Sequence, residues 1–262
     1  MEKGVAELIS PTNKIHCENI CKTFVQKNTQ KVHVLENINL DVRENEFLVL
    51  LGPGQSGKST LLRILAGLES PSSGKVLLND KTPHGPGPDR AMVFQTYSLF
   101  PWRTVRGNVE MGPKFKGMPK TQRMELADHY IKLVGLDGFQ DSFPHQLSGG
   151  MKQRVGIARA YVNSPEVLLL DEPFGQLDAQ TRYLMEQEIV RIWEQEKRTV
   201  LFVTNNIDEA IYVGDRIVSL KGKLPGMLDT VYDIDLPRPR EHSDLQFLEL
   251  RRRITDATEL TL

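Results

Sequence analysis

The chain has 262 residues, with 33 Lys and Arg against 34 Asp and Glu, so its formal charge is close to zero. This length allows one large α/β domain or two small ones, each with a sizeable core. The balanced charge lacks the basic field that nucleic-acid-binding proteins use, so we expect no DNA or RNA partner.

The two cysteines and the apolar runs exclude two further classes of protein. Cys17 and Cys21 have no second pair and no histidine at zinc-ligand spacing, so we expect reduced thiols rather than a metal site. The longest apolar runs, 47–51 and 167–170, are far shorter than a membrane span, and no leader pattern opens the chain. We therefore expect a cytosolic polypeptide whose role at a membrane would come through a partner.

The first predicted elements are strands at 15–19 and 32–42, where Ile38, Leu40 and Val42 alternate with polar residues. They predict a small, partly antiparallel β layer. Phe24 lies between the two runs, and its ring can either stack on a nucleobase or pack into the core. The residues alone favour neither role.

A phosphate-binding loop is predicted at residues 52–60, GPGQSGKST, which fit the pattern G-x-x-x-x-G-K-[ST]. The apolar run 47–51 precedes the loop and a helical pattern follows it, which is the context that the motif needs. Glycines let backbone N–H groups surround a polyphosphate, Lys58 would reach its β and γ phosphates, and the Ser59 hydroxyl would bind Mg²⁺. The loop consists of Gly52, Pro53, Gly54, Gln55, Ser56, Gly57, Lys58, Ser59 and Thr60.

A helical block is predicted at about residues 96–162. It follows a strand at 91–94 that ends at Gln95, and it precedes the apolar run 167–170. Ala127, Ile131 and Val134 share one helical face, and Gly135 is a candidate C-cap. The block is therefore an insertion between two strands of the core.

Two adjacent carboxylates, Asp171 and Glu172, follow the run 167–170. A carboxylate at the end of a buried strand next to a phosphate loop can hold Mg²⁺, and a second one can act as general base for an attacking water. We assign these roles to Asp171 and Glu172 respectively. Helical and strand patterns alternate from here to residue 220, which predicts a mostly parallel sheet.

Residues 147–154, LSGGMKQR, provide a second anion-binding pattern, since Ser148 can cap a helix whose first glycines leave N–H groups open. With GPGQSGKST and LLLDEP in this order, the chain resembles the ATP-binding subunit of ABC (ATP-binding cassette) transporters over about residues 14–237. The resemblance implies an α/β, P-loop NTPase core with a mostly parallel sheet, an N-terminal antiparallel β subdomain and an inserted helical subdomain. Residues 238–262 are left as a polar C-terminal tail.

The resemblance also implies the cofactors, ATP and Mg²⁺, and a set of site residues. Phe24 would stack on adenine, Gln95 would touch Mg²⁺ and water, and Asp178 would belong to the D-loop, although by itself Asp178 equally fits a helix cap. In such proteins two subunits enclose ATP between the phosphate loop of one and the LSGG motif of the other. Ser148, Gly149 and Gly150 would then serve the ATP held by the partner.

Two segments of the sequence indicate the binding partners of the chain. Residues 98–109 and 236–254 resemble importers of the nitrate, sulfonate and taurine group. This implies a second cassette, identical or related, transmembrane permease subunits at the cytoplasmic face of the membrane, and an extracytoplasmic substrate-binding protein. We expect Phe100, Pro101 and Trp102 to be exposed and to form a groove for a helix of a permease subunit, because aromatic residues are enriched at interfaces.

Asn205 stands where relatives have a histidine that contacts the γ-phosphate. An amide can donate a hydrogen bond but cannot carry a proton. The expected function is an ATPase that energises an importer. The alternative is an ATP-binding regulatory subunit with weak hydrolysis.

Overall fold

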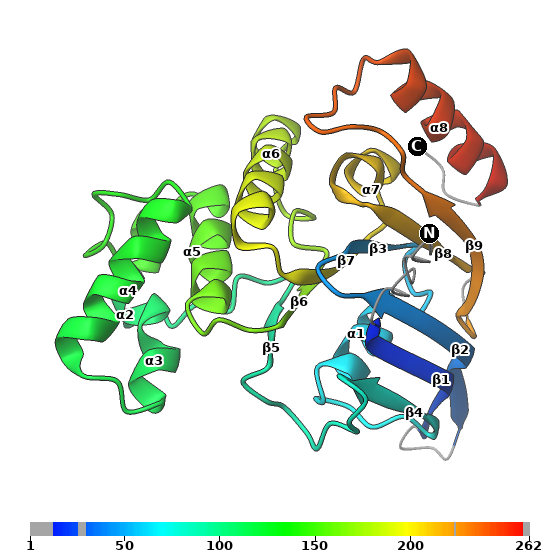
Figure 1. Ribbon diagram of the computed structural model, residues 1–262, viewed down its shortest axis with the longest axis horizontal. Coiled ribbons are helices and arrows are strands. Elements are labelled where there is room, and N and C mark those ends of the chain that lie inside the picture. The colour runs from blue at the N-terminus through cyan, green and yellow to red at the C-terminus, as the bar shows by residue number, and fades with distance from the viewer. Residues whose placement is uncertain (1–12, 26–29, 223, 259–262) are drawn as a thin grey trace, which may run out of the picture.

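The computed structural model describes residues 13–25, 30–222 and 224–258 (Figure 1). Two sheets form the centre of the molecule: one has six strands, in the order β5-β6-β7-β3-β8-β9, and one has three, in the order β2-β1-β4. A layer of helices lies beyond the β5 edge of the larger sheet (Figure 1). The predicted α/β architecture is therefore confirmed.

The six-stranded sheet carries the predicted apolar runs. Neighbouring strands are parallel except for the pair β8 and β9, which is antiparallel. Every residue of β3 and β6 is buried, because helices or the second sheet cover both faces of the central strands. The strands are β3 (Phe47–Leu51), β5 (Arg90–Val93), β6 (Val167–Asp171), β7 (Thr199–Thr204), β8 (Arg216–Lys221) and β9 (Met227–Asp233).

The three-stranded sheet is antiparallel throughout and consists of β1 (Asn13–Val25), β2 (Lys31–Arg43) and β4 (Ser73–Leu78). β1 is longer than predicted, so Phe24 lies within a strand rather than between two strands. Helix α1 (Lys58–Leu65) lies between the sheets, and its Leu61 and Leu62 pack against residues of both, including Ile38 and Leu48. The phosphate loop thus leads into a helix that is buried on two sides.

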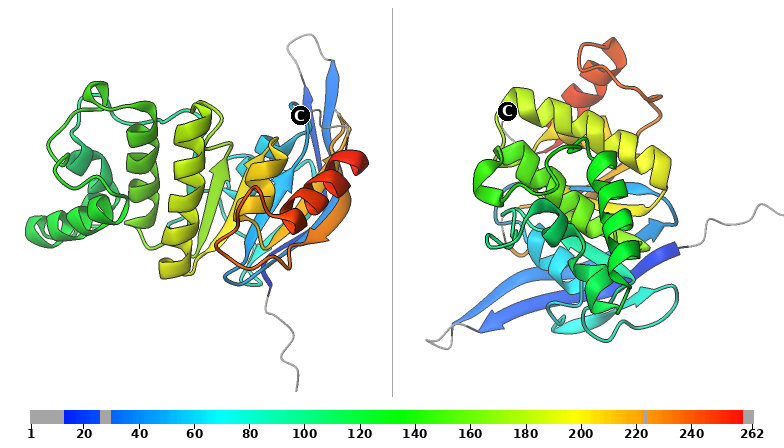
Figure 2. Two further views of the ribbon diagram at one scale, coloured as in Figure 1. Left: turned by 90° about the horizontal axis from the view of Figure 1, so that it is seen from above. Right: turned by 90° about the vertical axis from the view of Figure 1, so that its left-hand side faces the viewer.

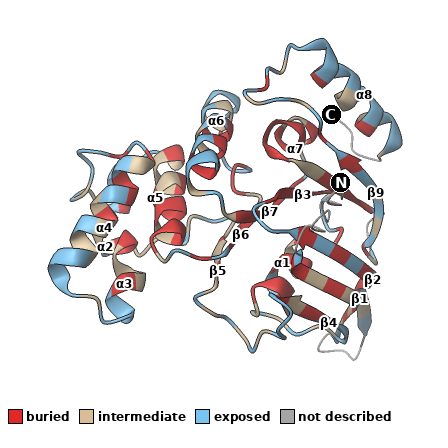
Figure 3. Ribbon diagram, in the orientation of Figure 1, coloured by how far each residue is buried: buried red, intermediate tan, exposed pale blue. Residues whose placement is uncertain are grey.

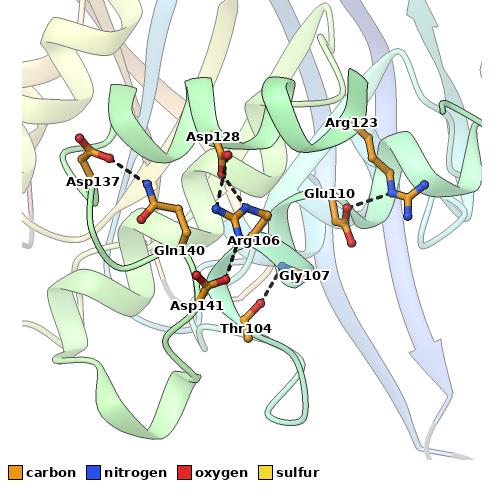
Figure 4. A network of polar contacts seen from close by, with 9 residues as sticks. All are labelled: Thr104, Arg106, Gly107, Glu110, Arg123, Asp128, Asp137, Gln140 and Asp141. Atoms are coloured by element: carbon orange, nitrogen blue, oxygen red, sulfur yellow. Dashed lines mark hydrogen bonds and ion pairs between the residues drawn. The ribbon is translucent and has the colours of Figure 1, made fainter. Parts of the chain in front are cut away.

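The inserted helices are α2 (Val105–Val109), α3 (Met111–Phe115), α4 (Lys120–Leu133) and α5 (Gly149–Tyr161), with a 3₁₀ turn at Pro144–Gln146. α4 ends as predicted, with Gly135 at a φ of 67°. Arg106 of α2 holds the insertion together, since its Nε lies 2.8 Å from Asp128 Oδ1 on α4 and its Nη1 lies 2.7 Å from Asp141 Oδ1 (Figure 4). The insertion is a packed subdomain.

The C-terminal half adds α6 (Ala179–Glu196), α7 (Ile207–Val213) and α8 (Leu245–Ala257). α8 lies beside α7 in Figure 1 and in the left view of Figure 2. Phe247 and Ile254 of α8 are buried. Figure 3 shows buried positions in red on this helix. The segment beyond residue 238 therefore packs on the domain. Within the described ranges, no helix is both long enough and apolar enough to cross a membrane.

Candidate functional site

The phosphate loop joins β3 to α1, and its shape depends on backbone conformations that most residues avoid. Gly57 has a φ of 90°, and a Cβ added there would lie 2.7 Å from Leu35 Cδ2 and 2.8 Å from Val34 O. Only glycine fits at this position. Gln55 also has a positive φ, 66°, which is uncommon for a side chain other than glycine. Two residues of the loop, Gln55 and Gly57, therefore adopt left-handed backbone conformations.

Lys58 closes the loop. Its side chain is nearly buried, and Nζ donates to Gly52 O at 2.7 Å and to Pro53 O at 2.8 Å. Burial lowers the pKa of Lys58, while Glu172 and Asp171 oppose that shift. Nζ lies 3.8 Å from Glu172 Oε1. Lys58 therefore joins both ends of the loop and places a cation next to the Glu172 carboxylate.

Ser59 and Asp171 meet although 112 residues separate them in the sequence. The Ser59 hydroxyl donates to Asp171 Oδ1 at 2.8 Å. Burial raises the pKa of Asp171, and the hydrogen bond from Ser59 acts in the opposite direction. A hydroxyl and a partly buried carboxylate are hard oxygen donors, which is the chemistry that Mg²⁺ prefers. The two residues therefore fit the magnesium role predicted for them.

Glu172 is held between two groups. Its Oε1 faces Lys58, and its Oε2 accepts a hydrogen bond from Gln95 Nε2 at 3.3 Å. Its backbone has a φ of 42°, at the turn directly after β6. Gln95 comes from the end of β5, the neighbouring strand. The parallel sheet thus brings the two side chains together at the carboxyl ends of adjacent strands.

Lys58, Ser59 and Glu172 border a cavity of about 300 Å³. The hydroxyl oxygen of Ser56 is buried and has no hydrogen-bond partner among the described residues. A buried donor without a partner is unfavourable, so this hydroxyl is suited to accept or donate to a bound group. The lining residues are Val34, Gln55, Ser56, Gly57, Lys58, Ser59, Thr60, Glu172 and Leu224.

Other predicted site residues lie outside this cavity. Ser148 caps α5, where its Oγ accepts from Met151 N at 3.3 Å, as the sequence predicts. Gly149 and Gly150 follow, and a Cβ on either would lie 2.7 Å from another side chain. Asp178 caps α6 and accepts from the backbone and the hydroxyl of Thr181. Ser148 to Gly150 and Asp178 thus lie at the N-termini of α5 and α6, apart from the cavity.

Phe24 and Asn205 are both exposed and do not line the cavity. The Phe24 ring is 38% exposed, and Lys22 Nζ lies 4.7 Å from its centre. The ring is therefore not a core aromatic. Asn205 directly follows β7, on the turn that leads into α7. Gln95 and Glu172 follow β5 and β6 at the same edge of the sheet.

The turn at Asn205 contains a buried network that the sequence did not reveal. Thr204 Oγ1 donates to Glu209 Oε2 at 2.6 Å and accepts from Asn206 N at 3.0 Å. Burial raises the pKa of Glu209 to about 7, and Arg182 lies 3.3 Å away. The Asn206 side chain caps α7. An Asn directly before a helical pattern is a signal that could have identified this cap.

The sequence of the chain matches the family model described as ABC transporter over residues 35–175, more than half of its length. The chain belongs to the ABC transporter family. A nitrate import ATP-binding protein, NrtD of Synechocystis, is 42% identical over 231 residues, covering 88% of this chain and 86% of the relative. An aliphatic sulfonates import ATP-binding protein, SsuB of Bacillus cereus, is 40% identical over 245 residues, covering 94% and 96%.

Among solved structures, a dimeric ATP-binding cassette in a post-hydrolysis state, bound to ADP and Pi, superposes on this ABC cassette with a TM-score of 0.75. The two sequences are 32% identical, and the match covers 85% of this chain and all of the other. The predicted family and the predicted activity are confirmed. This cassette is the ATP-binding, ATP-hydrolysing subunit of an ABC transporter, with relatives of the importer type.

Proposed function

We propose that this cassette drives an importer by closing with a second cassette around two shared ATP molecules. The observation that carries the proposal is the division of the site. The cavity holds Lys58, Ser59 and Glu172, whereas Ser148 to Gly150 lie at the N-terminus of α5, outside it. A helix N-terminus that begins with two glycines is suited to an anion, so a partner's ATP can meet it. The dimeric state of the solved cassette described above supports this arrangement.

Within each site, the residues of this chain have separate roles. Lys58 binds the phosphates through its charge. Ser56, whose hydroxyl has no hydrogen-bond partner among the described residues, lines the same cavity. Glu172, aimed by Gln95, takes a proton from the attacking water, a role worth roughly 10²- to 10⁴-fold in rate. Ser59 and Asp171 would hold Mg²⁺, with Gln95 close by, and the ion when bound neutralises phosphate charge. Phe24, exposed at the end of β1, would stack on adenine.

Asn205 favours a cassette that binds ATP but hydrolyses it more slowly. It lies at the turn after β7, where it would donate a hydrogen bond to the γ-phosphate but cannot acquire a charge. ATP binding and closure would persist while hydrolysis is reduced. The alternative function is therefore a subunit whose ATP binding regulates the transporter more than its turnover drives it. Asp178 at the cap of α6 would complete the contact between the two cassettes.

The remaining partners follow from the importer relatives and from one exposed aromatic cluster. Trp102 is 71% exposed, and its ring centre lies 5.7 Å from that of Phe100, which is half-buried rather than exposed as the sequence suggested. This pair would contact a permease subunit, because aromatic residues are enriched at protein interfaces. Such a contact would place the cassette at the cytoplasmic face of the membrane. An extracytoplasmic protein would deliver the substrate.

The shared site is tested with two substitutions. Replacing Glu172 with Gln removes the base and keeps the phosphate contacts, so the Glu172→Gln chain should bind ATP, lose turnover and elute as a dimer in ATP and Mg²⁺. Adding Ser148→Arg should return it to the monomer, whereas the control Ser243→Arg, at an exposed turn, should leave the dimer intact. A dimer that survives Ser148→Arg would contradict the shared site.

A further inference from the structure

Helix α7 begins two residues after Asn205 and is held at both ends by the C-terminal segment, residues 236–258. This segment passes α7 and returns as α8, which lies alongside it (Figures 1 and 2). α7 has only seven residues, so contacts from outside the helix decide its position more than its own hydrogen bonds do. Each end of α7 shows a separate contact.

At the C-terminal end of α7, Arg240 donates hydrogen bonds to the backbone carbonyl groups. Its Nη1 donates to Ile211 O at 2.6 Å, to Tyr212 O at 3.1 Å and to Gly214 O at 2.6 Å, while its Nε donates to Leu236 O at 3.0 Å. The side chain is only 4% exposed, and burial lowers its pKa to about 10. Arg240 therefore ties the last turn of α7 to the C-terminal segment.

At the N-terminal end of α7, α8 provides Arg251. Its Nε lies 2.8 Å from Asp208 Oδ1, as an ion pair without the alignment of a hydrogen bond. Asp208 N in turn donates to Asn206 Oδ1 at 2.8 Å, and Asn206 N donates to Thr204 Oγ1 at 3.0 Å. A short series of polar contacts thus connects α8 with the turn that carries Asn205.

α8 itself is anchored on the domain. Phe247 and Ile254 are 1% and 0% exposed, and the ring of His242 stacks on that of Phe247 with 4.9 Å between the ring centres. The far end of the helix reaches the phosphate loop, since Ala257 and Thr258 line a cavity of about 270 Å³ together with Pro53. α8 is therefore a packed element that borders one cavity with Pro53 and contacts the first turn of α7 at Asp208.

We propose that the C-terminal segment positions Asn205 for catalysis, with Arg251 as the positioning residue. The segment is docked on the domain, and its Arg251 is paired with Asp208. These contacts hold the first turn of α7, and so the turn before it, at a constant place relative to the phosphate loop. The inference rests on the proposed contact of Asn205 with the γ-phosphate. It gives the C-terminal segment, which the sequence predicted only as a polar tail, a role in catalysis.

The exposure of the ion pair separates this role from simple stabilisation. The side chains of Arg251 and Asp208 are 34% and 30% exposed, and partly exposed pairs of this kind add little to folding stability. Removing the pair should therefore leave the melting temperature almost unchanged. A catalytic group that shifts by a fraction of an ångström, by contrast, loses rate in the transition state.

The test compares Arg251→Gln with Arg252→Gln in the full chain assembled with its transporter. Arg252 lies on the same helix, its side chain is 85% exposed, and in the described part of the chain its one ion pair is with Asp256 one turn later, so it is a matched control. Arg251→Gln should lower kcat about three- to tenfold, with KM for ATP and the melting temperature unchanged. Arg251→Lys, which keeps the charge, should retain most of the rate. Equal kcat in Arg251→Gln and Arg252→Gln would overturn the proposal.

Repeating the Arg251→Gln substitution in an Asn205→Ala chain tests whether Arg251 affects kcat through Asn205. If Arg251 acts through Asn205, Arg251→Gln should cost no further rate once Asn205 is Ala. A full additional loss in that background would overturn the positioning role while leaving the role of Asn205 intact. An unchanged kcat in Asn205→Ala alone would instead refute the proposed role of Asn205, and with it this inference. The two failures are therefore distinguishable.

Discussion

Replacing Gly57 with Ala should damage nucleotide binding more than folding. Gly57 has a φ of 90°, and an L-residue in a left-handed conformation costs about 1–2 kcal/mol. The added Cβ would also lie 2.7 Å from Leu35 Cδ2 and 2.8 Å from Val34 O. Leu35 is 2% exposed and cannot swing aside, and Val34 O belongs to the backbone of β2, so the overlap adds about 1–3 kcal/mol.

The loop relieves this strain by moving away from β2, which removes its N–H groups from their places around the phosphates. A loss of at least about 2 kcal/mol corresponds to about 30-fold weaker binding. The assay is titration with a fluorescent ATP analogue, together with thermal unfolding. Gly117→Ala is the control, because Gly117 has a φ of 75° with no atom within 4 Å of an added Cβ. Equal affinity in Gly57→Ala and Gly117→Ala would refute the reasoning.

Two further predictions concern the exposed residues Asn205 and Trp102. Asn205→His should raise kcat by about tenfold with KM little changed, since a group that can become charged stabilises the transition state more than the ground state. No increase in the assembled complex would mean that Asn205 does not limit the rate. A crosslinker attached at Trp102 should capture a permease subunit. The same crosslinker attached at the exposed Phe139 is the control and should capture less. Equal capture from both positions would contradict a specific contact at Trp102.

Local sequence determined the central strands and the chemical groups of the site. The apolar runs at 47–51 and 167–170 became β3 and β6 within one residue, because a strand buried on both faces is almost entirely apolar. The caps at Ser148 and Gly135 could also be predicted, since a cap depends on the few residues around it. The strand β9 escaped prediction because this edge strand is mostly exposed and carries polar residues.

Tertiary structure alone decided which of these groups meet. Ser59 contacts Asp171 from 112 residues away, and Gln95 contacts Glu172 from 77, because the parallel order of β5, β6, β7 and β3 places their carboxyl ends at one edge. No local pattern encodes the order of strands in a sheet, since that order depends on long-range packing. The same holds for α8: its sequence appears polar, yet Phe247 and Ile254 are buried because the domain provides a surface for them. Residue spacing thus specified the chemistry, and packing between distant segments specified its geometry.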